Sequence, residues 1–108
     1  MLQKKRRLSK KDIDLIFKEG KSISSSSLNF KFTLTPSLVL SRISFIAPKN
    51  IAKLAVKRNL LRRRGYRALG KHIDQFPLGI IGVFVFKKFQ EDISIIENEI
   101  KNILSKIN

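Results

Sequence analysis

The nearly continuous apolar segment from Leu78 to Phe86 constrains the fold of this chain more than any other feature. It is short, and β-branched and aromatic residues fill most of it, which favours a strand over a helix. Polar residues do not alternate with the apolar ones, so both faces of the strand must be covered. We therefore expect this segment at the centre of a small sheet on which other elements pack.

A second segment, Leu28–Leu34, alternates between apolar and polar residues and predicts a half-buried strand. One face would carry Leu28, Phe30, Phe32 and Leu34, and the other Asn29, Lys31 and Thr33. A further strand is predicted within 38–47, before Pro48, because proline cannot donate to a ladder. The Ser-rich stretch 22–27 fits either a loop or the approach to an edge strand.

Three helices are predicted, at 10–19, from 51 or 53 to 69, and at 94–107. Ser9 and Asp12 have the spacing of a capping box before the first helix. Gly20 and Gly70 are suited to end the first and second. The order α-β-β-α-β-α predicts an α+β fold, with helices packed on a small mixed sheet. We expect a single domain over 1–108, with 1–8 as a basic N-terminal arm.

The middle helix is strongly cationic, since Lys53–Arg67 holds seven Lys or Arg among fifteen residues and no acidic residue. From Gly20 to Ile73 the chain has twelve Lys or Arg and no Asp or Glu, and the net charge of the whole chain is +15. The Lys and Arg side chains of such a helix repel one another, so the helix is most stable when it binds a surface of dense negative charge. This pattern predicts a nucleic-acid-binding surface rather than a merely solvated helix face.

At about 100° per residue, Leu54, Leu61 and Ala68 form a narrow apolar stripe along this helix. Gly65 lies beside the stripe, which predicts a close approach between the helix and the sheet. Arg outnumbers Lys among the cations, which suits bidentate contacts with phosphates. Asn59 is suited to hydrogen-bond a phosphate, a base or a 2′-hydroxyl, or to link the helix to a neighbouring loop.

Four aromatic side chains are candidates for stacking on unpaired bases: Phe17, Phe30, Phe32 and Tyr66. Each also fits the hydrophobic core, Phe30 in particular, because aromatic residues at helical or strand spacing commonly pack inside a domain. The pattern leaves both interpretations open.

The residues that commonly carry catalysis are sparse. Cys is absent, which excludes disulfides and thiolate chemistry, and His72 is the only histidine, expected as an exposed loop side chain. There is no nucleophile elbow, no phosphate-cradling glycine loop and no acidic pair with metal-ligand spacing. No segment resembles a secretory signal or a membrane span. We expect a soluble, cytoplasmic binding protein with no catalytic or metal-ligating residue of its own.

Several segments together carry a resemblance to a known family. They are Arg7-Leu8, Lys10-Lys11, Phe17-Lys18-x-Gly20, the strand at 28–34, and Arg42-x-Ser-Phe-x-Ala-Pro-Lys49. The most specific is Ala55-Val-Lys-Arg-Asn-Leu-Leu-Arg-Arg63, which is similar to the helix Ala-Val-x-Arg-Asn-Arg-x-Lys-Arg. Over nearly its whole length the chain resembles the protein subunit of bacterial ribonuclease P.

This resemblance implies a ribonucleoprotein that removes the 5′ leader from precursor tRNA. It implies that the RNA subunit holds the catalytic centre and the Mg²⁺ ions, and that one protein binds each RNA. It also implies a left-handed β-α-β crossover, in a fold shared with a ribosomal protein domain. The basic helix would contact the catalytic RNA through Lys53, Lys57, Arg58, Asn59, Arg62, Arg63, Arg64 and Arg67. A cleft between the first helix and the sheet would take the leader and include Ile13, Phe17, Phe30, Lys31 and Phe32.

The chain departs from the family pattern at identifiable positions. Leu60 and Tyr66 stand where the family commonly has Arg, and Ile13 stands where it commonly has Phe. One residue is inserted near Lys53. Two alternatives remain at this stage: a ribosomal protein that binds rRNA, and a DNA-binding regulator, which would need base-reading side chains and usually a dimer.

Overall fold

The apolar segment forms the strand β4 (Ile80–Phe86), in which every residue except Val85 is buried. It lies between β2 (Leu28–Leu34), its antiparallel partner, and β3 (Arg42–Ile46), its parallel partner. A fourth strand, β1 (Lys21–Ser24), pairs with β2 and completes a sheet of order β1-β2-β4-β3. The prediction of a central strand covered on both faces is confirmed.

The computed structural model describes residues 8, 10–34 and 41–107. Its three α-helices are α1 (Lys10–Glu19), α2 (Ala55–Gly70) and α3 (Ile93–Ile107), and a short 3₁₀ turn spans Ile73–Gln75. The order α-β-β-β-α-β-α differs from the predicted order by β1. The α+β class and the mixed sheet are confirmed. Predictions for the arm at 1–7, for the cap at Ser9 and for residues 38–40 of a strand lie outside the described residues.

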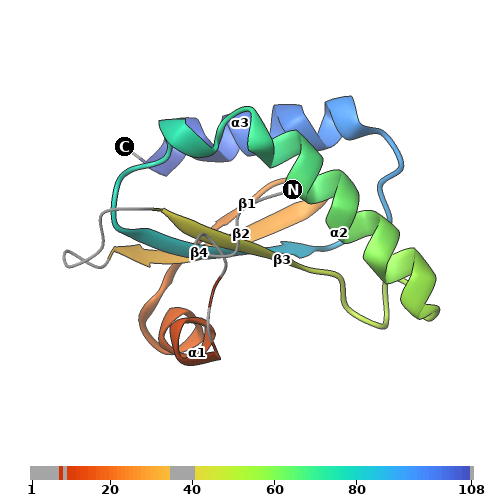
Figure 1. Ribbon diagram of the computed structural model, residues 1–108, viewed down its shortest axis with the longest axis horizontal. Coiled ribbons are helices and arrows are strands. Elements are labelled where there is room, and N and C mark those ends of the chain that lie inside the picture. Colours follow the sequence, from red (N-terminus) through yellow and green to blue (C-terminus); the bar gives the residue numbers. More distant parts are fainter. Residues whose placement is uncertain (1–7, 9, 35–40, 108) are drawn as a thin grey trace.

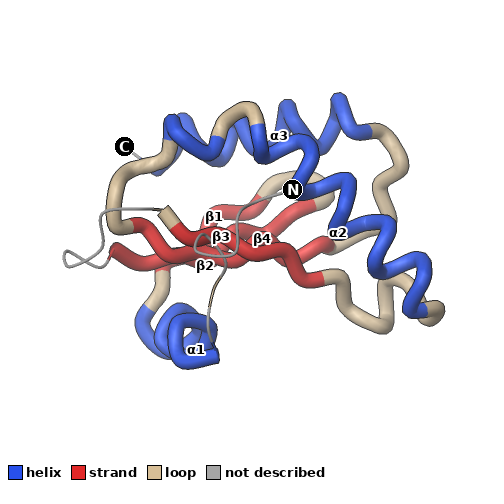
Figure 2. Tube along the Cα trace, viewed as in Figure 1, coloured by secondary structure: helices blue, strands red, loops and turns tan. Residues whose placement is uncertain are grey.

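The sheet separates the helices into two layers, with α2 and α3 on one face and α1 on the other (Figures 1 and 2). The main core lies between the sheet and the helices α2 and α3. In it, Phe84 stacks on Phe30 and Phe45 at centroid distances of 4.3 and 5.0 Å. A smaller cluster between α1 and the other face of the sheet consists of Ile16, Ile81 and Val83. Each face of the sheet therefore has its own buried layer.

Gly65 allows α2 to approach the sheet closely, as the sequence predicts. A Cβ atom added at this position would lie only 2.5 Å from Cδ1 of Phe45. The ring of Tyr66 packs edge-on against the same phenylalanine at 5.1 Å, and the Phe45 amide donates a hydrogen bond to the Tyr66 hydroxyl at 3.2 Å. These contacts fix α2 on β3.

The parallel strands β3 and β4 are joined through α2. In Figure 1 both strands run to the right, α2 lies above the sheet, and β3 lies in front of β4. This is a left-handed crossover, whereas almost all β-α-β units are right-handed. The hand implied by the family resemblance is confirmed.

Two element boundaries differ from the predictions for local reasons. The Ser-rich stretch forms β1 and a turn at 25–27, and its single apolar residue, Ile23, is too little to signal a strand. Helix α2 begins at Ala55 rather than at 51 or 53. The preceding residues form a turn instead, in which the amides of Ile51 and Ala52 donate to the Pro48 carbonyl.

Candidate nucleic-acid interface

The outer surface of α2 is mostly cationic or polar, with Val56 as its largest exposed apolar side chain. The helix buries only Leu61, Gly65, Ala68 and Leu69. Among the eight predicted RNA-contact residues, Lys53, Lys57, Asn59, Arg63 and Arg67 are exposed, and Arg58, Arg62 and Arg64 are half-buried. All eight belong to one continuous stretch of the chain: seven lie on α2, and Lys53 lies in the residues just before it.

The N-terminus of α2 adds to this positive surface. Leu54 occupies the N-cap position without a side-chain cap, and the first turn holds no acidic residue. The first amide groups of a helix have no partner within the helix, and the macrodipole places partial positive charge there. An anion bound at this end would satisfy both the amides and the neighbouring cations.

Arg58 is partly engaged in the structure of the protein itself. Its Nη1 donates hydrogen bonds to the carbonyls of Ala52 at 3.0 Å and Lys53 at 2.7 Å. A guanidinium has five N–H donors, so this leaves most of them for another acceptor. Arg58 therefore holds the loop that precedes α2 while presenting its remaining donors on the cationic surface.

Two further cations of α2 have partners within the chain. Arg62 donates to the side-chain oxygen of Asn59, so this asparagine bonds within its own helix rather than to a neighbouring loop. Arg64 donates to the carbonyl of Gln90 at 3.3 Å and lies 5.8 Å from the centroid of the Phe89 ring. Arg64 consequently connects α2 to the loop after β4.

That loop contains residues that the sequence reasoning missed. Lys87 and Lys88 are exposed, and their Nζ atoms donate to the Ser25 carbonyl and the Ser26 hydroxyl at 2.8 and 3.1 Å. The signal was present in the sequence, as two lysines followed by Phe89 directly after the central strand. Only the fold shows that this loop lies beside α2.

On the opposite face of the sheet, α1 leaves an aromatic side chain accessible. Phe17 is 49% exposed, and the Nζ of Lys31 on β2 lies 4.8 Å from the centroid of its ring. Ile13 lies on the same helix and is half-buried. The structure thus brings three of the five predicted cleft residues to this face.

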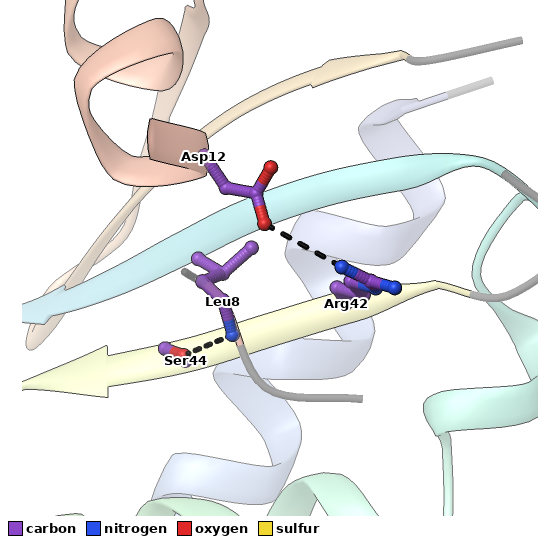
Figure 3. Close-up of polar contacts among 4 residues, drawn as sticks. All are labelled: Leu8, Asp12, Arg42 and Ser44. Atoms are coloured by element: carbon purple, nitrogen blue, oxygen red, sulfur yellow. Dashed lines mark hydrogen bonds and ion pairs between the residues drawn. The ribbon is translucent and has the colours of Figure 1, made fainter. Parts of the chain in front are cut away.

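Polar contacts hold the start of α1 against β3 (Figure 3). Asp12 and Arg42 form an ion pair at 3.7 Å, and the Leu8 amide donates to the hydroxyl of Ser44 at 3.2 Å. Both β3 residues project from the face of the sheet that α1 covers. These contacts fix the position of the helix that carries Phe17.

The side chains of Phe30 and Phe32 do not lie beside Phe17, although Phe32 lines a depression of about 240 Å³ with Glu19 at the end of α1. Both side chains point to the opposite face of the sheet, where they are 0% and 8% exposed and stack on each other at 5.2 Å. The alternation of β2 places Lys31 toward α1 and its phenylalanine neighbours toward α2 and α3. Their burial settles the earlier alternatives in favour of the core.

His72 is also placed differently from the prediction, because it is buried rather than exposed in a loop. Its Nε2 lies 2.9 Å from Oε1 of Glu97 on α3. This hydrogen bond, with a smaller contribution from the charges of Lys71 and Lys101, lowers the pKa of the Glu97 carboxyl despite partial desolvation. The pair joins the residues after α2 to α3 and has a structural role.

Within residues 8, 10–34 and 41–107, no three His, Asp or Glu side chains gather as metal ligands would. None of the helices in these ranges is long and apolar enough to span a membrane.

A protein-family comparison matches the chain over residues 1–108 to the family described as Ribonuclease P. The chain belongs to the ribonuclease P protein family. It is therefore a ribonuclease P protein subunit, and its association with the RNA of that enzyme and with tRNA processing follows from the family. A comparison with curated protein sequences returns no significant match.

Solved structures of ribonuclease P proteins have the same fold. The protein from Thermotoga maritima matches with a TM-score of 0.82 at 25% identity, over 94% of this chain and 97% of that one. A Staphylococcus aureus ribonuclease P protein mutant, described as defective in mRNA degradation activity, matches with a TM-score of 0.83 at 19% identity, over 96% and 89%. A second S. aureus structure matches with a TM-score of 0.79 at 18% identity, over 94% of each chain.

Proposed function

We propose that this ribonuclease P protein binds the catalytic RNA through α2 and the 5′ leader of precursor tRNA through the face that carries α1. The observation that carries the proposal is the separation of the two surfaces by the sheet. One face presents a helix without acidic residues, and the other presents an exposed Phe17 beside the ammonium of Lys31. Cations suit a folded RNA backbone, and an exposed ring suits an unpaired base.

In this proposal the protein contributes binding, and the chemistry belongs to the RNA. Mg²⁺ would be held mainly by the RNA subunit and the substrate. The chain supports this division because its charge favours polyanions, and the stretch from position 20 to 73, which includes α2, contains no carboxylate. One protein would bind each RNA in the cytoplasm.

Cleavage of precursor tRNA tests the proposal directly. The purified protein alone should leave the precursor intact, and addition of the cognate RNA at low Mg²⁺ should produce a mature 5′-phosphate end. Cleavage by RNA-free protein would contradict the placement of the catalytic centre in the RNA. A mass measurement of the reconstituted particle checks the ratio of one protein to one RNA.

Variants on the two faces test the assignment of each surface. Arg63→Ala should weaken binding to the catalytic RNA and reduce its dependence on salt, because one phosphate contact is lost. Phe17→Ala should leave that affinity unchanged and reduce the preference for precursor over mature tRNA by about 1–3 kcal/mol. If Phe17→Ala weakened RNA-subunit binding instead, the assignment of the α1 face would be wrong.

A further inference from the structure

The outward face of α2 carries an apolar pair that phosphate binding does not explain. Val56 and Leu60 lie one turn apart, and Val56 is 68% exposed. Together with Lys57, Asn59 and Arg63 they line an open depression of about 250 Å³. At about 100° per residue, these positions lie largely on the side of the helix opposite its buried face.

The occupant of this depression must combine an apolar surface with negative charge. Val56 and Leu60 gain from removal of their side chains from water, whereas Lys57 and Arg63 attract anions. The space is smaller than the roughly 300–1,000 Å³ of pockets that hold drug-sized ligands, so it suits a single ring system. A duplex would offer phosphates and sugars and leave the apolar pair largely uncovered. An unpaired nucleotide offers both a flat base and flanking phosphates.

We propose that the depression at Val56 and Leu60 takes the base of one unpaired nucleotide of the catalytic RNA. This inference rests on the proposed function, which assigns α2 to that RNA. The two aliphatic side chains pack against the base, and Lys57 and Arg63 bind the phosphates beside it. The amide nitrogen of Asn59 donates to the base edge while its oxygen accepts from Arg62. Leu60 thereby exchanges the phosphate contact of an arginine for contact with a base.

Salt dependence separates a base contact from a phosphate contact. The double variant Val56→Gln/Leu60→Gln should bind the cognate RNA about tenfold more weakly at every salt concentration, with the slope of log K against log salt unchanged. Lys57→Ala should instead make the slope shallower by about 0.7–0.9. Leu78→Gln is the matched control, because Leu78 is 75% exposed and precedes β4 at the other end of the sheet. It should bind like the wild type.

Chemical probing of the RNA locates the nucleotide. Dimethyl sulfate, which modifies the Watson–Crick edges of unpaired A and C, and a carbodiimide reagent for U and G should show one base that the wild-type protein protects and the double variant does not. The protection should be present without precursor tRNA. Wild-type affinity in the double variant, a changed slope, or protection that needs the precursor would each overturn the inference. Loss of RNA binding by the wild-type protein would instead refute the proposed function.

Discussion

At the scale of single residues, the glycines of α2 illustrate how surroundings decide the effect of one methyl group. A Cβ at Gly65 would overlap the Phe45 ring, with 2.5 Å between the nearest atoms, whereas a Cβ at Gly70 would meet no atom within 4 Å. Both positions lie in the same helix, where alanine is intrinsically preferred to glycine. At Gly65, replacement by alanine therefore gains helix propensity and loses packing, whereas at Gly70 it gains propensity without a packing cost.

Gly65→Ala should lower the free energy of unfolding by about 1–3 kcal/mol, because overpacking against Phe45 exceeds the gain in helix propensity. Gly70→Ala should raise it by roughly 0.4–1 kcal/mol, since the unfolded chain loses freedom at no steric cost. Urea unfolding followed by circular dichroism measures both. Equal changes in the two variants would show that Phe45 moves aside without cost.

The limits of sequence reasoning also appear at this scale. Alternation in 28–34 predicts correctly that Phe30 and Lys31 point to opposite faces, but both faces of the sheet carry a helix. The leader cleft that the family resemblance implies includes both Phe30 and Lys31, whereas in the structure only Lys31 lies beside Phe17 and Phe30 is in the main core. The hydrogen bond between buried His72 and half-buried Glu97 joins segments 25 residues apart, and only the fold brings them together.

At the scale of elements, local pattern predicted most of what the structure contains. Helix α1 spans Lys10–Glu19 as expected, and Gly20, which follows it directly, is a local signal for its end. The Ser-rich sequence of β1 fits a loop as well as a strand, since Lys21–Ser24 owes its conformation to pairing with β2 and not to its own composition. The continuous surface of α2 was predicted because charge density is itself a sequence property.

The turn between β1 and β2 depends on a buried carboxylate of α3. Glu99 is 7% exposed, and its Oε1 accepts hydrogen bonds from the Ser27 amide at 2.6 Å and from the Ser25 hydroxyl. Glu99→Ala should cost about 1–3 kcal/mol of stability, because the buried amide loses its acceptor. Glu99→Gln retains an oxygen and should cost less. Thermal unfolding compares the two, and equal losses would show that the acceptor is unimportant.

The contact between His72 and Glu97 should make stability depend on pH. The folded-state pKa of Glu97 is lowered, so the stabilisation is present above the unfolded pKa and is lost as the pH falls through the folded value. Unfolding temperatures should decline between about pH 5 and pH 3, and Glu97→Gln should flatten that decline. An unchanged pH profile in the variant would show that other carboxyl groups dominate.

At the scale of the whole molecule, the sheet is a partition: it separates two surfaces as well as supporting the helices. It supports α1 on one face and α2 on the other, with a separate buried layer on each side. The net charge of +15 draws RNA toward the molecule as a whole, whereas the partition decides which surface each RNA meets. The family could be predicted from motifs, but this division of surfaces depends on the topology.

The partition has a consequence for the energetics of the assembled particle. Phe17 and Arg63 share no neighbour, because the sheet and its two layers lie between their helices. Their losses should be additive: for assembly of the protein with both the catalytic RNA and precursor tRNA, the free-energy loss in Phe17→Ala/Arg63→Ala should equal the sum of the single-variant losses within about 0.5 kcal/mol. A coupling energy well above that value would reveal communication across the sheet. If the losses are additive, substitutions on one surface do not alter binding at the other, and the two surfaces are free to change independently during evolution.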